Sequence, residues 1–218
     1  KNSLLSSIPY TVKEKRHPDE VAPGELWYKR PYKVHRIPTG DGDKTVMVVC
    51  PKTMNPKAPC PICEHMTELR KDWDANQEAI KNYSSKNRDL YLMYNHDSKS
   101  VVLLDEAHGG GNLMGFGALL DARITNPRAE EWAAFWLDGD DGMALDVFWK
   151  EDGSFKWCKP VSIDFVDRKK APVPKDIWKQ CVELSELLIV KSYKELEAMY
   201  FGIPDDERPP VGALRRAK

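Results

Sequence analysis

The sequence predicts a mainly β protein with small helices, arranged as a small, partly open Greek-key barrel with a cysteine-containing insert. Three observations predict this fold. Segments that interleave aromatic or β-branched residues with polar ones occur in pairs around turn sequences such as TGDGDK and NHDSK, which is the pattern of β-hairpins. Short helical stretches separate these pairs, and the chain shows neither a βαβ rhythm nor an internal repeat. Many short strands joined by hairpins favour a small barrel.

The composition is that of an ordinary globular protein. The 218 residues are 41% apolar and 31% charged, with a formal net charge of −1, and a chain of this length can bury a sizeable core. No run approaches the roughly 20 apolar residues that a membrane helix needs, and no secretory leader is evident. Five cysteines with only one CxxC pair favour a reducing compartment. We therefore expect a cytoplasmic protein without a membrane partner.

In the first half of the chain, residues 1–24 are polar and contain three prolines, so they predict an irregular N-terminal arm. Residues 25–38 (ELWYKRPYKVHRIP) and 45–50 (TVMVVC) predict two strands that pair as a hairpin. A proline-rich loop follows and ends in CPIC at 60–63. Residues 64–83 have apolar positions at helical spacing and predict a helix.

In the second half, residues 88–106 predict another hairpin and residues 143–168 a third, which turns at Asp152-Gly153. Short helices are predicted at 116–124 and 127–138, the second with Pro127 near its first turn. An apolar stripe predicts a further helix over 177–188. Ser192 and Glu195 have the spacing of a capping box for a last helix ending near Gly202. Residues 204–218 predict a flexible C-terminal tail.

Three of the five cysteines lie within fourteen residues, and His35 lies fifteen positions before the first of them. The set reads H-x14-C-x9-C-x2-C and comprises His35, Cys50, Cys60 and Cys63. CxxC directs two sulfurs to one point, and pairing across the hairpin turn brings His35 near Cys50. Four N and S ligands suit tetrahedral Zn²⁺ with no position left for water. The pattern therefore predicts one structural zinc ion that stabilises the fold.

Alternatives to this ligand set remain open. His65 is a rival fourth ligand, although it lies only two residues after Cys63. Cys50 could instead be a buried strand residue and CxxC a redox pair, but the thioredoxin-like reading needs a βαβ setting. Cys158 and Cys181 occupy a predicted strand and an apolar helical stripe, so we interpret both as core residues.

The spacing of these ligands, within YKVHRIP and VVCPKTMNPKAPCPICE, resembles that of the single-stranded DNA-binding proteins of tailed phages, the helix-destabilising or gene-32-protein type. In that family one His and three Cys hold zinc in the same order inside an OB-fold core. The resemblance covers about residues 25–168. It implies an OB fold, a partly open five-stranded barrel with a zinc-binding insert and peripheral helices. The core would span 25–203 and the zinc subdomain about 35–83.

Charge and aromatic residues point to the same function. Residues 27–57 have a local balance of +5, and a basic stripe can attract a polyanion, although a solvated mixed surface is the simpler reading. Binding of single strands without sequence readout needs a basic groove and aromatic faces on which bases stack. Core packing is the alternative for each aromatic residue. The candidate DNA-binding residues are Tyr28, Lys29, Arg30, Tyr32, Lys33, Arg36, Lys52, Lys57, Tyr83, Arg88, Tyr91 and Tyr94.

Motifs of catalysis are incomplete, so we expect no enzyme. DEAH at 105–108 lacks the phosphate loop that a helicase needs, and HGGG at 108–111 lacks a G-x-S-x-G nucleophile elbow. DGDDG at 138–142 does not fit the EF-hand register. A metalloenzyme would also need an open ligand position on the ion.

The sequence thus predicts a single-stranded DNA-binding protein that coats unpaired strands in phage DNA replication, recombination and repair. The expected partners are single-stranded DNA, replication and recombination proteins, and further copies of the chain along the strand. The location would be the host cytoplasm. The alternative is a zinc-stabilised protein-interaction module that does not bind nucleic acid. It would use the acidic segment 128–152, which has a local balance of −6.

Overall fold

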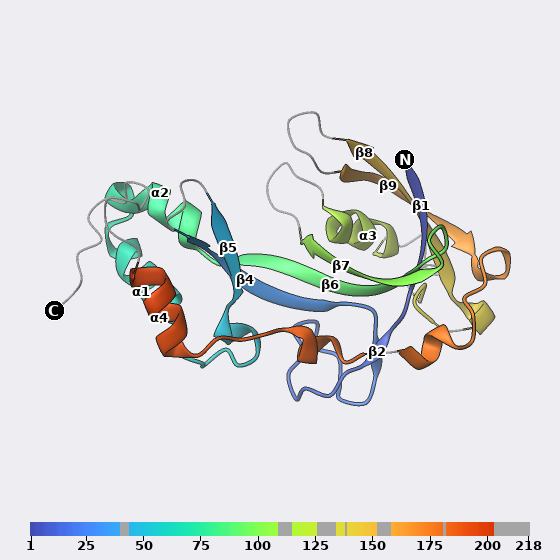
Figure 1. The fold of residues 1–218 in the computed structure, drawn as a ribbon, viewed down its shortest axis with the longest axis horizontal. Coiled ribbons are helices and arrows are strands. Elements are labelled where there is room, and N and C mark those ends of the chain that lie inside the picture. The colour runs from blue at the N-terminus through green and yellow to red at the C-terminus, as the bar shows by residue number, and fades with distance from the viewer. Residues whose placement is uncertain are drawn as a thin grey trace. The chain divides into compact units, whose positions relative to one another are not determined.

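The computed structural model describes residues 1–39, 44–108, 115–125, 134–137, 139–151, 158–180 and 182–202. The chain divides into two compact units. Unit 1 comprises Lys1–Pro31 and Asn87–Leu187, and unit 2 comprises Tyr32–Lys86 and Leu188–Lys218. The fold is mixed α/β with a mostly antiparallel sheet (Figure 1).

Unit 1 is built on antiparallel strand pairs. Strands β7 and β6 form a hairpin, β6 also pairs with β1, and β8 lies between β1 and β9. Within the described residues no pairing joins β7 to β9, so the sheet is not closed into a barrel. A small separate sheet consists of β2 (Tyr10–Thr11) and β3 (Leu26–Trp27). The strands of the main sheet are β7 (Ser100–Ala107), β6 (Lys86–Asn95), β1 (Asn2–Ser7), β8 (Met143–Glu151) and β9 (Cys158–Asp167).

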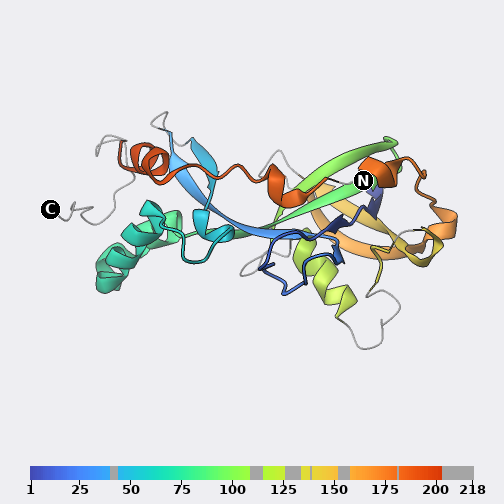
Figure 2. The ribbon, with the colours of Figure 1, turned by 90° about the horizontal axis from the view of Figure 1, so that it is seen from below.

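The core of unit 1 lies between this sheet and helix α3 (Phe116–Ile124). Figures 1 and 2 both show α3 beside β9. Alternate residues of each strand face this core, as the period of two in a strand requires. Leu145 and Val147 of β8 are completely buried there, together with Tyr91 of β6 and Phe116 of α3.

The expectation of an irregular arm over residues 1–24 was wrong for its first part. Residues Asn2–Ser7 form β1, which pairs on one side with β6 and on the other with β8. A strand between two neighbours satisfies its backbone donors and acceptors on both sides. The prolines, which cannot donate to such a ladder, begin only at Pro9.

The described residues of unit 2 form the β4–β5 hairpin and three α-helices. The predicted hairpin is confirmed, because β4 (Arg30–Pro38) pairs with β5 (Thr45–Val49). The predicted helix over 64–83 is two helices, α1 (Pro61–Leu69) and α2 (Trp73–Tyr83), separated by the short 3-10 helix η2 (Arg70–Asp72). The second helix starts where Asp72 caps it by accepting from Ala75 N at 3.4 Å. Such an N-cap satisfies an otherwise unpaired amide.

The C-terminal helix α4 (Tyr193–Phe201) begins with the predicted capping box and ends at Gly202. The predicted helix over 177–188 was wrong, because this segment forms two 3-10 turns, η6 (Ile177–Gln180) and η7 (Leu184–Leu187). Ser185 explains part of the difference, since its hydroxyl donates to Glu14 at 2.7 Å and accepts from Arg30. A prediction from helix propensity considers only neighbouring residues and cannot include these long-range hydrogen bonds.

Several expectations lie outside the described residues: most of the helix predicted over 127–138, the Asp152-Gly153 turn, Cys181 and the tail over 204–218. The predicted hairpins over 88–106 and 143–168 and the helix over 116–124 are confirmed as β6–β7, β8–β9 and α3. Among the helices that the structure describes, none has both the length and the apolar character to span a bilayer.

Candidate metal centre

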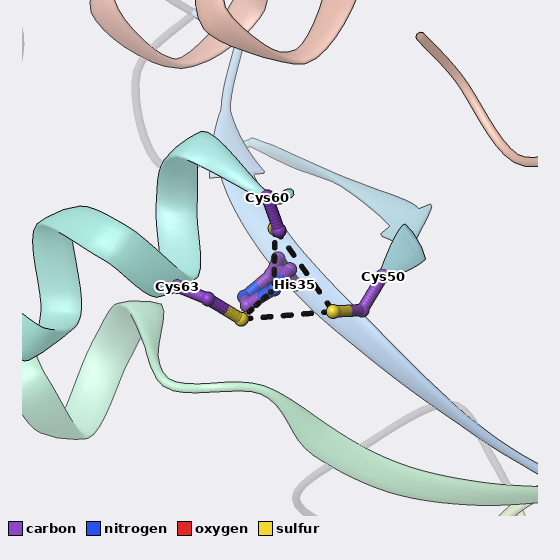
Figure 3. A group of neighbouring side chains, drawn as sticks. All are labelled: His35, Cys50, Cys60 and Cys63. Carbon is purple, nitrogen blue, oxygen red and sulfur yellow. Dashed lines mark hydrogen bonds between the residues drawn. The ribbon is translucent and has the colours of Figure 1, made fainter. Parts of the chain in front are cut away.

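Four side chains from three elements of unit 2 converge on one point. His35 lies in β4, Cys50 directly follows β5, and Cys60 and Cys63 lie at the start of α1. Their ligand atoms all lie within 4.8 Å of one another, and Figure 3 shows the imidazole surrounded by the three sulfurs. It is the only such group among the described residues. The structure thus confirms that these four residues come together.

The hairpin register explains why Cys50 meets His35. His35 pairs with Val48 across the hairpin, and Cys50 is two residues further along on the same face. The backbone holds this corner, because Cys50 N donates to Lys33 O at 2.8 Å. Thr53 adds a side-chain bond, since its Oγ1 accepts from Lys33 N at 2.9 Å. The first thiol is therefore fixed by the strand pair itself.

The CxxC pair is fixed by the beginning of α1. Cys60 is the N-cap in an extended conformation, Pro61 occupies the first turn, and Glu64 N donates to Cys60 O at 3.0 Å. Proline is well suited to this position because its missing N–H is not needed there. The unpaired amides and positive dipole end of a helix N-terminus favour thiolates. Cys63, one turn later, then faces the same point as Cys60.

The distances fit a single tetrahedral ion. Cys50 Sγ is 4.0 Å from Cys60 Sγ and 3.6 Å from Cys63 Sγ. His35 Nε2 is 3.6 Å from Cys60 Sγ and 3.4 Å from Cys63 Sγ. A tetrahedron with Zn–S near 2.3 Å and Zn–N near 2.0–2.1 Å requires about 3.8 Å between sulfurs and about 3.6 Å between sulfur and nitrogen. The sulfurs are too far apart for disulfides, and these cysteines are free.

His35 is oriented by a backbone group. Its Nδ1 lies 3.0 Å from the carbonyl oxygen of Tyr83, at the end of α2. A carbonyl can only accept, so Nδ1 is protonated and Nε2 is the ring nitrogen that faces the sulfurs and would bind a metal ion. Metal-binding histidines are commonly held in this way by an outer partner. The sequence could not reveal Tyr83 in this role, because the bond uses its main chain.

Crowding in a buried site shifts the protonation of the ligands. Burial lowers the pKa of His35, but hydrogen bonds to Cys60 and Cys63 outweigh it and raise the pKa to about 9. Hydrogen bonds from Cys50 and Cys63 lower the pKa of Cys60, whereas hydrogen bonds to Cys60 and Cys63, followed by burial, raise that of Cys50. The cluster therefore shares protons among close donors and acceptors. A divalent cation would take the place of those protons.

The site could hold one metal ion and is compatible with a structural zinc. One imidazole nitrogen and three thiolates fill all four positions of a tetrahedron, so none is left for water or substrate. Three of the ligand side chains are fully buried, and only Cys63 is partly exposed. The site suits a structural role.

The rival histidine is not part of the ligand group. His65 Nδ1 lies 2.9 Å from the hydroxyl of Tyr200 on α4. Cys158 is exposed and lies in β9, so it is not the core residue that the sequence predicted. The other three histidines have partners in unit 1: His17 with Tyr10, His96 with Ser6 and His108 with Asp89.

The five tyrosines proposed for base stacking are buried. Their exposed fractions are 7% or less, and Tyr28, Tyr83 and Tyr91 belong to the hydrophobic cores of the two units. Tyr28, for example, stacks on Trp136, and Tyr83 meets Tyr200 edge to face. A ring packed in a core has no free face for a base, so the core-packing alternative describes these side chains. The tyrosines are Tyr28, Tyr32, Tyr83, Tyr91 and Tyr94.

The predicted cations fall into two groups. Lys29 and Arg30 are buried and neutralised in unit 1, Lys29 by Asp121 at 3.2 Å and Arg30 by Glu14 at 2.8 Å. Arg88 is bonded to Asp105 at 2.7 Å. A buried, paired cation is not available to a phosphate. The second group, Lys33, Arg36, Lys52 and Lys57, is exposed or half-exposed in unit 2.

The chain matches no family model and no curated protein. Lys44 is also exposed in unit 2, although it was not among the predicted contacts. The local charge balance of residues 27–57 was the available signal.

Proposed function

We propose that the chain binds single-stranded DNA without regard to sequence and coats it during phage DNA replication, recombination and repair. One observation supports this most directly. The described residues 32–39 and 44–60, which surround three of the four metal ligands, contain five cations and no carboxylate. All five are exposed or half-exposed in unit 2, and we propose that together they contact DNA; they are here called the basic surface and are Lys33, Arg36, Lys44, Lys52 and Lys57.

The basic surface is held by the same contacts that hold the metal centre. The main chain of Lys33 accepts from Cys50 N and donates to Thr53 Oγ1, and Lys52 lies in the short 3-10 helix η1 (Pro51–Thr53), directly after Cys50. Cations fixed on such a scaffold can contact several phosphates of one strand at little loss of conformational freedom. In this proposal the bound ion is zinc, and its role is structural and not catalytic.

The finer fold is part of the proposal. Neighbouring strands in unit 1 follow the order β7, β6, β1, β8 and β9. This order supports an OB fold whose barrel is open between β7 and β9. The ligand spacing H-x14-C-x9-C-x2-C, which resembles the gene-32-protein type, supports the same family. The expected setting is the host cytoplasm, with replication proteins and neighbouring copies of the chain as partners.

Since the tyrosines are buried, phosphate contacts should supply most of the affinity. For single strands each neutralised phosphate lowers log K by about 0.7 per log unit of salt. The test is a titration of dT oligonucleotides of graded length at several salt concentrations. The variant K33Q/K52Q/K57Q should bind more weakly, and its salt slope should be shallower by about 2.

A matched control removes three exposed lysines from unit 1. The variant K169Q/K170Q/K175Q makes the same change in net charge in the unit that lacks the basic surface, and its slope should equal that of the native protein. Equal slopes for both triple variants would show that the basic surface does not contact the strand. Absence of oligonucleotide binding by the native, metal-loaded protein would favour the alternative, a zinc-stabilised protein-interaction module. Quenching of tryptophan fluorescence by poly-dT gives an independent readout.

A further inference from the structure

The C-terminal helix α4 contacts the metal-binding helix directly beside a ligand. Tyr193 OH donates to Glu64 Oε2 at 2.9 Å, and Tyr200 OH lies 2.9 Å from His65 Nδ1. Glu64 and His65 are the two residues that follow Cys63 on α1. Over 120 residues separate these partners in sequence, so only the folded unit brings them together.

The same helix also supports the group that orients His35. The ring of Tyr200 packs edge to face against that of Tyr83, with centroids 5.4 Å apart, and the Tyr83 carbonyl accepts from His35. Leu196 and Tyr200 are buried in one core with Cys50 and Cys60. Helix α4 therefore contacts both α1, which carries Cys60 and Cys63, and Tyr83, whose carbonyl orients His35.

On its own, α4 is a weak element. It has nine residues, and isolated helices of fewer than about 12–15 residues are marginal in water. Its capping box and the burial of Leu196 and Tyr200 hold it in place. Short, marginal elements open locally far more often than a whole protein unfolds. Closed tetrahedral sites, by contrast, offer no vacant position to an attacking chelator.

We propose that α4, while it is docked on α1, slows the loss of the metal ion. The ion leaves mainly from the state in which α4 has detached. Tyr200 is the positioning residue that keeps this detached state rare. Detachment removes the support of Glu64, His65 and Tyr83 together, and so frees Cys63 and His35 to move. This inference rests on the metal centre and is independent of the proposed binding of DNA.

The experiment measures the rate at which zinc-loaded protein releases its ion to an excess of a chromogenic chelator. Tyr200→Ala should release zinc at least about tenfold faster, which corresponds to about 1.4 kcal/mol of weaker docking. Tyr200→Phe keeps the ring and removes the hydroxyl that contacts His65, so its release should be faster by about fivefold or less. The matched control is Glu197→Ala on the exposed side of α4, which should release zinc at the native rate.

A second measurement covers a Tyr200→Ala protein that is isolated without metal. Reconstitution with Co²⁺ should give the visible spectrum of a tetrahedral thiolate site, and that spectrum should decay faster than in the native protein when chelator is added. Hydrogen exchange of α4 should rise in parallel with the release rate across the variants. Release at the native rate from a Tyr200→Ala protein whose α4 amides exchange freely would overturn the proposal.

Discussion

Replacing Cys60 by serine should unfold unit 2 and leave unit 1 folded. Unit 2 has 66 described residues, namely 32–39, 44–86 and 188–202, and at ~0.05–0.15 kcal/mol per residue a unit of this size has a folding free energy of about 3–10 kcal/mol. A structural zinc contributes about 10–16 kcal/mol at neutral pH. Without the ion the balance falls to about zero or below. The core of unit 1 shares no residue with the core that contains Cys50 and Cys60, so it should persist.

Hydrogen exchange followed by mass spectrometry measures this directly. In the Cys60→Ser protein the amides of α1 and α2 should lose protection, whereas those of β1 and β8 should keep it. Chelation of the native protein should give the same pattern. Cys158→Ser is the matched control, because Cys158 is exposed and lies outside the ligand group. Native protection of α1 and α2 in a metal-free Cys60→Ser protein would refute the structural role of the ion.

Three further changes test the rest of the fold. Glu14→Gln leaves the guanidinium of Arg30, only 1% exposed, without its carboxylate and should lower the free energy of unfolding of unit 1 by about 3 kcal/mol in urea at pH 7. Burial raises the pKa of Glu14, but hydrogen bonds and Arg30 lower it overall. The ionised Glu14 therefore stabilises the fold above its usual pKa, and this stabilisation is lost as the pH falls through its lower pKa in the folded protein. The stabilities of the variant and the native protein should then converge in acid. Gly117→Ala would place a Cβ 2.7 Å from Asp89 Oδ2 and should lower the melting temperature, at a cost of about 1–3 kcal/mol. Ser192→Ala removes the capping box of α4 and should lower the stability of this helix by about 1 kcal/mol. Hydrogen exchange of the α4 amides should therefore be faster than in the native protein.

The ligand set could be predicted because its geometry is local. CxxC at a helix start directs two sulfurs to one point, and a hairpin register places His35 beside Cys50. Both rules act within about 30 residues. The support of the site could not be predicted in the same way, because Tyr83 acts through its carbonyl and Tyr200 comes from the far end of the chain.

The fold follows the same division. The hairpins β4–β5, β6–β7 and β8–β9 were predicted from turn sequences and alternation, and the structure has all three. Strand β1 was missed because its partners are distant: Leu5 pairs with Asn95 on one side and with Leu145 on the other. Its short polar sequence has no strand signal of its own, and only the two neighbouring strands make it a strand.

The aromatic residues show a limit of alternation as a guide to function. A period of two separates the faces of a strand but does not tell which face meets the core. Tyr28 and Tyr91 occupy positions at which alternation allowed a stacking surface, yet both side chains belong to the core of unit 1. Burial, and not residue type, decides whether a ring is free to bind a base.

The cations near the boundary between the two units fall into two groups. Lys29 and Arg30 lie just before the boundary between the units and are neutralised inside unit 1, whereas Lys33 and Arg36 lie just after it and are exposed on unit 2. The basic surface therefore belongs entirely to the unit that contains the candidate metal centre. An unfolded unit 2 would keep its charges, but a strand of DNA would then have to order them on binding, at a loss of conformational entropy. The metal centre and the proposed DNA contacts are thus linked through one short hairpin, although no ligand of the ion needs to contact the strand.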